Sequence, residues 1–223
     1  MDYFIRKVGA LPGAGAAWDS GGWSVGETIG IEKFVTPGHG HQPKTEARML
    51  HDGESIAVMF RVEDRYVLAK GKAYQARTHR DSCVEFFVEP VAGKGYFNFE
   101  FNCIGTLLLT YIEDSTRKGD GFEKYREVPE SLAAGIEVHA SLAGPIEEEI
   151  TEPTTWTVSY RFSKELFEAY VGPLASFDGL EMRGNVYKCA DECSHPHWGY
   201  WADIGDVLDF HQPDIFVPFV CES

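Results

Sequence analysis

Short runs of alternating or continuous apolar residues recur along the chain, and Gly, Pro, Asp or Asn residues separate them. Many short runs with turn residues between them are typical of a β-sandwich or β-barrel. One short helix is predicted over Ser163–Tyr170, since Ser163 can cap its start and Gly172 can end it. The predicted strands are Ser55–Val62, Ser82–Val88, Tyr96–Asn102, Gly105–Ile112, Ile136–Leu142, Thr155–Phe162, Glu181–Cys189 and Ile215–Cys221.

Two longer stretches lack this pattern. Asp114–Glu130 is charged and contains Gly, which predicts a long loop. Cys189–Pro213 is also irregular and is rich in His, Trp and Asp. Neither stretch has the composition of a linker, so we predict one all-β domain over residues 1–223, an antiparallel β-sandwich with one short helix.

The strand predicted over Tyr96–Asn102 alternates strictly between apolar and polar residues. Successive side chains of a strand point to opposite faces of the sheet. Its three Phe residues therefore share one face and are predicted to pack in the core. The opposite face carries two amides and a carboxylate, namely Asn98, Glu100 and Asn102.

Polar side chains occupy the corresponding face of two further predicted strands. These are Glu85 in Ser82–Val88, and Arg183 with Asn185 in Glu181–Cys189. If the three strands share a sheet, their polar faces form one patch with donors and acceptors for the hydroxyl groups of a sugar. The alternative is a plain solvent-exposed face. The scarcity of Lys and Thr on these strands favours the binding surface.

An aromatic and histidine-rich segment lies between His195 and His211. Aromatic rings on loops at the edge of a sandwich can stack on the C–H faces of sugar rings. Trp198 and Trp201 are the candidates for such stacking. The alternative is that both rings close the open end of the sandwich as part of the core, because Trp is highly buried on average.

Two metal sites are conceivable from the ligand types. Cys189, Cys193, His195 and His197 offer zinc ligands, although their spacing matches no common zinc motif, so a zinc or redox protein stays an alternative. Our leading hypothesis expects no cofactor, and a bound calcium ion is its one open alternative. Its oxygen ligands could come, without EF-hand spacing, from Asp81, Asp191, Asp203, Asp206 and Asp209.

Glu85 and Glu100 could also form the carboxylate pair of a glycosidase. The sequence does not give their separation, so a small glycoside hydrolase remains an alternative to binding. G-x-S-x-G, Walker and dinucleotide-binding motifs are absent from the sequence. We therefore predict no catalytic residues.

The formal net charge of −15 narrows the classes of partner. So acidic a surface disfavours nucleic acids and anionic membranes and suits neutral ligands. Five cysteines in a chain of 223 residues do not suggest a secreted disulfide framework. No signal peptide is recognisable, which predicts a cytoplasmic protein, although a secreted chain without its leader would look the same.

Several segments carry a family resemblance: TEARMLHDGESIAVMFRVED (Thr45–Asp64), DSCVEFFVEP (Asp81–Pro90), YFNFEFNCIGTLLLTY (Tyr96–Tyr111), RGNVYKCAD (Arg183–Asp191) and FHQPDIF (Phe210–Phe216). In these motifs the chain resembles the carbohydrate-binding family 9-like proteins, a group related to the DOMON-type sandwiches. The resemblance covers the chain from about Pro43 to its end.

The resemblance implies an antiparallel β-sandwich, of immunoglobulin or jelly-roll type, that binds sugars without catalysis. It implies ligands such as xylan or glucan fragments, with Glu85 and Asn185 holding the sugar, and some family members contain structural calcium. Together with the strand patterns it gives a predicted ligand-binding set of Glu85, Asn98, Glu100, Asn102, Arg183, Asn185, Lys188, Trp198, Trp201 and His211.

Overall fold

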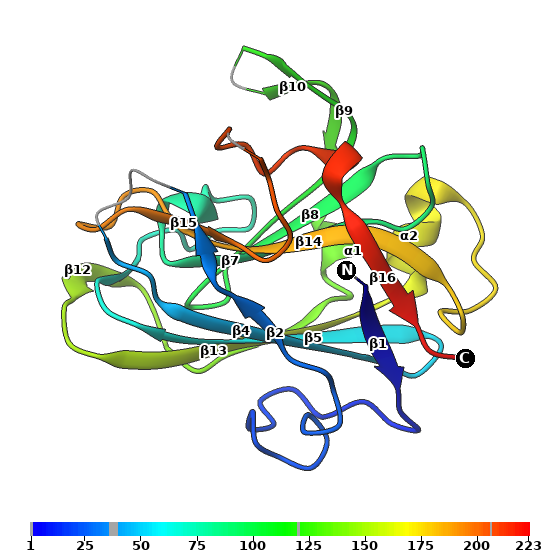
Figure 1. Ribbon diagram of the computed structural model, residues 1–223, viewed down its shortest axis with the longest axis horizontal. Helices are drawn as coiled ribbons and strands as arrows, with labels where there is room; N and C mark the ends of the chain where they lie inside the picture. The colour runs from blue at the N-terminus through cyan, green and yellow to red at the C-terminus, as the bar shows by residue number, and fades with distance from the viewer. Residues whose placement is uncertain (1, 36–39, 120, 206) are drawn as a thin grey trace.

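Two β-sheets packed face to face make up the protein, as a computed structural model shows for residues 2–35, 40–119, 121–205 and 207–223 (Figure 1). The main strands of the first sheet lie in the order β10 (Gly121–Glu127), β9 (Leu107–Lys118), β8 (Tyr96–Asn102), β7 (Cys83–Glu89), β14 (Glu181–Ala190), β16 (Val217–Cys221) and β1 (Tyr3–Lys7). Two short strands extend it at one side: β15 (His197–Tyr200) pairs with β14, and β3 (Lys33–Phe34) pairs with β15.

The second sheet continues from β1, which pairs in parallel with β16 on one side and with β4 on the other. All other strand pairs among the described residues are antiparallel. The strands of the second sheet are β4 (Lys44–His51), β5 (Ser55–Asp64), β13 (Thr154–Ser163) and β11 (Glu137–Ala140), with β2 (Ile29–Ile31) on β4. The remaining elements are the separate pair β6 (Val67–Ala69) and β12 (Ile146–Ile150), the helices α1 (Glu130–Ala133) and α2 (Lys164–Val171), and two short 3-10 helices, η1 (Thr78–Arg80) and η2 (Pro213–Ile215).

Aromatic side chains from both sheets fill the space between them. The alternation in β8 turns its three Phe side chains inward, where all are fully buried. The Phe99 ring lies 4.9 Å from Phe162, and the Phe101 ring lies 4.4 Å from Tyr160, both on β13. Each such side chain contributes about 1.5–3 kcal/mol through burial. The predicted antiparallel sandwich is confirmed.

The eight predicted strands and the helix over Ser163–Tyr170 are present, with ends shifted by a few residues. The loop predicted over Asp114–Glu130 is wrong. There β9 continues to Lys118 and returns as β10, forming a hairpin that projects from the body (Figure 1). Most of its side chains are exposed and charged, so it lacks the apolar alternation that marks a half-buried strand. The short helix α1 was not predicted either.

Gly184 on β14 lies against β7 so closely that a Cβ atom there would meet the carbonyl oxygen of Phe87 at 2.3 Å. Gly184→Ala is therefore expected to lower the free energy of unfolding by about 1–3 kcal/mol through overpacking, as measured by urea denaturation. The control is Gly9→Ala, where a Cβ atom would meet nothing within 4 Å. Equal stability of the two variants would contradict this reading of the β7–β14 contact.

None of the helices in the described part of the chain is long and apolar enough to cross a membrane.

Candidate functional site

A cleft opens on the outer face of the first sheet. Its floor consists of Glu85 on β7, Glu100 on β8 and Cys189 on β14, all buried. Loop residues, together with Arg117 on β9 and Trp198 on β15, form its walls. The cleft has a volume of about 400 Å³ and is lined by His79, Glu85, Glu100, Arg117, Cys189, Asp191, Trp198, Leu208, Asp209, Phe210 and His211.

A side hollow of about 460 Å³ adjoins the cleft over β8, β9 and β10. It shares four lining residues with the cleft, namely His79, Glu100, Arg117 and His211. It adds Asn98 on β8 and two aromatic residues of the projecting hairpin, Phe122 and Tyr125. Cleft and side hollow thus form one continuous groove across the sheet.

The strand register brings two acidic side chains together on the floor. Glu85 and Glu100 occupy directly opposite positions of β7 and β8, on the face away from the core. The carboxyl of Glu85 is 3% exposed, and Cys189 Sγ donates a hydrogen bond to its Oε1 over 3.0 Å. Burial, and then the charge of Glu100, raise the pKa of Glu85 well above its usual range. Glu85 therefore keeps its proton and can donate a hydrogen bond to a ligand.

Glu100 is held by neighbours on three sides. Asn98 Nδ2 donates to its Oε1 over 2.8 Å, and Thr78 Oγ1 donates to its Oε2 over 3.4 Å. His79 Nδ1 lies 3.5 Å from the same Oε2, and the hydrogen bond to Glu100 raises the pKa of His79. These contacts fix the carboxylate so that it presents an acceptor to the cleft.

Two wall residues are oriented by acidic partners. Trp198 on β15 is half-buried, and its Nε1 donates to Asp191 Oδ1 over 2.8 Å. Arg117 pairs with Asp209 over 2.8 Å, and its guanidinium lies 4.6 Å from the centre of the Phe122 ring. The Trp198 ring is thereby held beside the polar floor, which is the arrangement that a sugar ring needs for stacking.

His211 forms part of both the cleft and the side hollow. Its Nδ1 lies 2.9 Å from the hydroxyl of Tyr96, and its ring is 4.7 Å from Phe87 and 4.5 Å from Phe122. Burial, and then the charge of Arg117, lower the pKa of His211 to about 3. The imidazole is therefore neutral near pH 7 and offers neutral hydrogen-bonding groups.

Of the predicted ligand-binding set, Glu85, Glu100, Trp198 and His211 line the cleft, and Asn98 lines the side hollow. Three others hold the backbone outside this groove. Asn102 Nδ2 donates to Gly71 O and to Asp81 Oδ2, Arg183 donates to Phe216 O and Asp214 O, and Asn185 Nδ2 donates to Ala202 O.

Lys188 and Trp201 lie on the inner side of the first sheet. Lys188 is fully buried: its Nζ lies 3.6 Å from Asp64 Oδ2 and donates to His197 Nε2 over 2.7 Å. The Trp201 ring packs edge-on against Tyr3 and Phe219 in the core. Trp201 therefore packs against the core, as the alternative interpretation of the sequence proposed, and it does not line the cleft.

The structure does not bring the suggested zinc ligands together. Cys189 faces the cleft, whereas Cys193 Sγ lies 3.6 Å from Ser82 Oγ in a small separate cluster. The His195 ring stacks on Tyr66, and His197 faces Lys188.

The aspartates suggested for calcium are also dispersed. Asp81 accepts from two backbone amides, Asp203 from the amide of Gly205, and Asp191 and Asp209 line the cleft. No group of these four converges as metal ligands would, and Asp206 lies outside the described residues.

Seven residues of the cleft were not in the predicted ligand-binding set: His79, Arg117, Cys189, Asp191, Leu208, Asp209 and Phe210. All but Arg117 and Cys189 lie outside the strands, where alternation gives no signal. Arg117 belongs to the part of β9 that was interpreted as loop. Asp191 and Asp209 drew notice from the sequence only as possible metal ligands.

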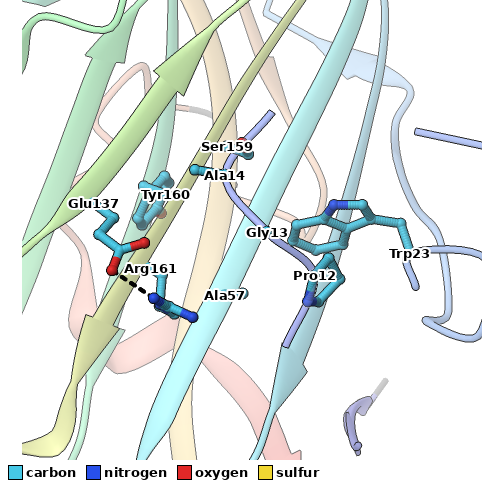
Figure 2. Close-up of a pocket in the computed structure, with 9 residues that line it drawn as sticks. All are labelled: Pro12, Gly13, Ala14, Trp23, Ala57, Glu137, Ser159, Tyr160 and Arg161. Carbon is cyan, nitrogen blue, oxygen red and sulfur yellow. Dashed lines mark hydrogen bonds and ion pairs between the residues drawn. The ribbon is translucent and has the colours of Figure 1, made fainter. Parts of the chain in front are cut away.

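A different hollow lies on the outer face of the second sheet (Figure 2). Trp23 and Pro12 line one side of this hollow, and the ion pair of Glu137 with Arg161 lines the other side. Its volume is only about 10 Å³, which is room for about one water molecule. The groove on the first sheet is therefore the candidate ligand site.

Comparison with known proteins points in the same direction. The sequence model of the family described as carbohydrate-binding family 9 matches residues 27–219. A comparison with curated proteins gave no match. One similar crystal structure is of a protein from Bacteroides uniformis ATCC 8492 that is assigned as carbohydrate-binding. That protein is 25% identical in sequence to this chain, and the two structures have a TM-score of 0.82 over 100% of both chains.

Two further structures are of a carbohydrate-binding module of family 9 from Caldicellulosiruptor kristjanssonii. The one in complex with cellotriose is 12% identical, with a TM-score of 0.66 over 100% of this chain and 94% of that one. The one in complex with glucose is 12% identical, with a TM-score of 0.64 over 99% and 96%. At this identity the likeness shows the fold alone.

Proposed function

Because the chain belongs to carbohydrate-binding family 9, we propose that it binds a carbohydrate in the cleft over β7, β8 and β14. The observation that carries the proposal is the pairing of a buried polar floor with an oriented aromatic ring. Glu100 accepts from ligand hydroxyls, the protonated Glu85 donates to them, and Trp198 offers its face to the C–H groups of a sugar ring.

The charge around the cleft favours a neutral sugar. Besides the protonated Glu85, three acidic residues line it, Glu100, Asp191 and Asp209, and Arg117 is already paired with Asp209. A uronic acid or a sugar phosphate would have to approach these carboxylates, at a cost of like-charge repulsion. Neutral glucose- or xylose-based ligands avoid this cost.

The side hollow extends the proposal to oligosaccharides. A first sugar unit would lie over Glu85 and Glu100, and a second would continue towards Phe122 and Tyr125 on the hairpin. Glucan and xylan fragments of two or three units are therefore the first ligands to test. The Caldicellulosiruptor module in complex with cellotriose provides the precedent for such a ligand on this fold.

Isothermal titration calorimetry with glucose, cellotriose and xylotriose tests the proposal. Glu100→Gln and Trp198→Ala are each expected to weaken binding by about 1–3 kcal/mol, since each loses a direct contact with the ligand. Glu89→Gln is the matched control, because Glu89 is also a buried carboxyl on the outer face of β7 but binds the turn at Gly93, outside the cleft.

The control variant is expected to bind like the wild type. The absence of binding to a broad array of neutral glycans by the folded wild type would contradict the proposal. Equal losses in Glu89→Gln and Glu100→Gln would place the ligand elsewhere.

One observation supports hydrolysis of a glycosidic bond as a second candidate function. Glu85 keeps its proton next to Glu100 on the adjacent strand, and glycosidases require one protonated and one ionised carboxyl. In this case Glu85 would act as the general acid and Glu100 as the nucleophile or base. Turnover of chromogenic β-glycosides that disappears in both Glu85→Gln and Glu100→Gln would favour hydrolysis over binding alone.

A further inference from the structure

Three potential metal ligands converge on the floor of the cleft. The register of β7 and β14 puts Cys83 directly opposite Cys189, and Glu85 lies two residues further along the same face of β7. The two sulfur atoms and a carboxylate oxygen of Glu85 all lie within 4.8 Å of one another. Among the described residues, no other group of three His, Cys, Asp or Glu side chains converges as closely.

The spacing suits a tetrahedral ion. Bonds of about 2.3 Å to sulfur and about 2.1 Å to oxygen place tetrahedral ligand atoms roughly 3.5–3.8 Å apart. Cys189 Sγ is 3.0 Å from Glu85 Oε1, so small rotations of these side chains suffice to surround an ion. Three protein ligands leave the fourth position open, and the cleft, which Cys189 and Glu85 line, provides the path of entry.

We propose that Cys83, Glu85 and Cys189 form a binding site for one thiophilic divalent cation of the zinc class. Two sulfur ligands disfavour Ca²⁺ and Mg²⁺, which prefer oxygen. The site differs from the combination of Cys189, Cys193, His195 and His197, whose members face different parts of the structure.

The acidic side chains around the site suit a cation. Glu100 lies opposite Glu85, and Asp191 also lines the cleft, so negative charge surrounds the three ligands. Binding of one M²⁺ displaces to solvent the protons that the ligand atoms carry, and it leaves two thiolates and a carboxylate on the ion.

Titration with Co²⁺ under a phosphine reductant tests the site by absorbance. One equivalent of Co²⁺ is expected to produce thiolate-to-cobalt charge-transfer absorption, which Zn²⁺ then displaces. Cys83→Ser and Cys189→Ser are each expected to lose this absorption. Cys193→Ser is the matched control, because Cys193 is a buried cysteine outside the cluster, and it is expected to keep the absorption.

Absence of the band in the reduced wild type, or its persistence in both Cys83→Ser and Cys189→Ser, would overturn the proposal. A measurement on the wild type covers the case in which these variants do not fold. Zn²⁺ should slow alkylation of Cys83 and Cys189 more than that of Cys221, as followed by mass spectrometry, and equal slowing of all three would overturn the site. Neither experiment involves a carbohydrate, so its outcome is independent of the proposed sugar binding.

Discussion

Replacing Asp64 by Asn is expected to lower the free energy of unfolding by about 3–5 kcal/mol, because it leaves a buried lysine without its counter-charge. The Asp64 and Lys188 side chains are both fully buried between the sheets, and Asp64 Oδ2 lies 3.6 Å from Lys188 Nζ. Oδ2 has no hydrogen-bond partner, so the lysine is its main source of stabilisation. Urea denaturation of the wild type and the variant measures the loss.

Two further variants separate the effect of charge from that of shape. The double variant Asp64→Asn/Lys188→Met removes both charges and is expected to recover most of the loss. Asp178→Asn removes one partner of the half-exposed pair between Lys7 and Asp178 and is expected to cost less than about 1 kcal/mol. A loss in Asp64→Asn as small as that in Asp178→Asn would show that Lys188 is not held by a buried ion pair.

The contribution of His197 to the free energy of unfolding is expected to fall by about 3 kcal/mol between pH 6.5 and pH 4, because this histidine is buried in its neutral form. Burial, and then the charge of Lys188, lower the pKa of His197 to about 3. Above pH 6.5 the residue is neutral in the folded and the unfolded chain. Below pH 6.5 only the unfolded chain takes up the proton, so each pH unit costs about 1.4 kcal/mol until the folded pKa is reached.

The charged groups near His197 determine how stability changes at still lower pH. Asp64 lies beside Lys188 and His41, and although burial alone would raise its pKa, Lys188 and then His41 lower it to about 2. The stabilisation from the Asp64 carboxylate is therefore complete above about pH 4 and lost between about pH 4 and pH 2. Loss of stability at mildly acidic pH is thus assigned to His197 together with His211, whose pKa burial also lowers to about 3, and the further loss below pH 4 to Asp64.

The slope of unfolding free energy against pH checks this assignment. His197→Asn removes the titrating ring and is expected to flatten the slope between pH 6.5 and pH 4. His139→Asn, which replaces an exposed histidine of β11, is expected to leave the slope unchanged. A slope that is the same in His197→Asn and in the wild type would assign the acid sensitivity to other groups.

The sequence predicted the sandwich because its central strands bury one face and expose the other. The three Phe residues of β8 reveal the core side, and Glu100 therefore had to lie on the opposite side. The projecting part of the hairpin, β9 beyond Ile112 and β10, was missed because its stability comes from backbone pairing and surface ion pairs, such as Lys124 with Glu113, and most of its side chains are exposed. Alternation cannot reveal such a strand.

Within the candidate site, alternation identified the face of a residue but not its distance from the cleft. Asn102 and Glu100 share one face of β8, yet Asn102 holds the turn at Gly71 while Glu100 lies on the floor of the cleft. Lys188 was placed with the ligand-binding residues, although its neighbours Tyr187 and Cys189 point outward and it points inward. His79, in a short 3-10 helix, and Asp209, in a loop, reach the cleft only through tertiary packing, which no local pattern encodes.

The parallel pairing of β1 with β16 also determines how the fold responds to force. Tyr3 lies opposite Phe219, and Ile5 lies opposite Cys221, so the chain enters at one end of this ladder and leaves at the other. Tension between the start of β1 and the end of β16 acts along the strands, and it loads their hydrogen bonds together in shear. A module held by both ends in this way resists extension until the whole ladder breaks at once, instead of opening one bond at a time.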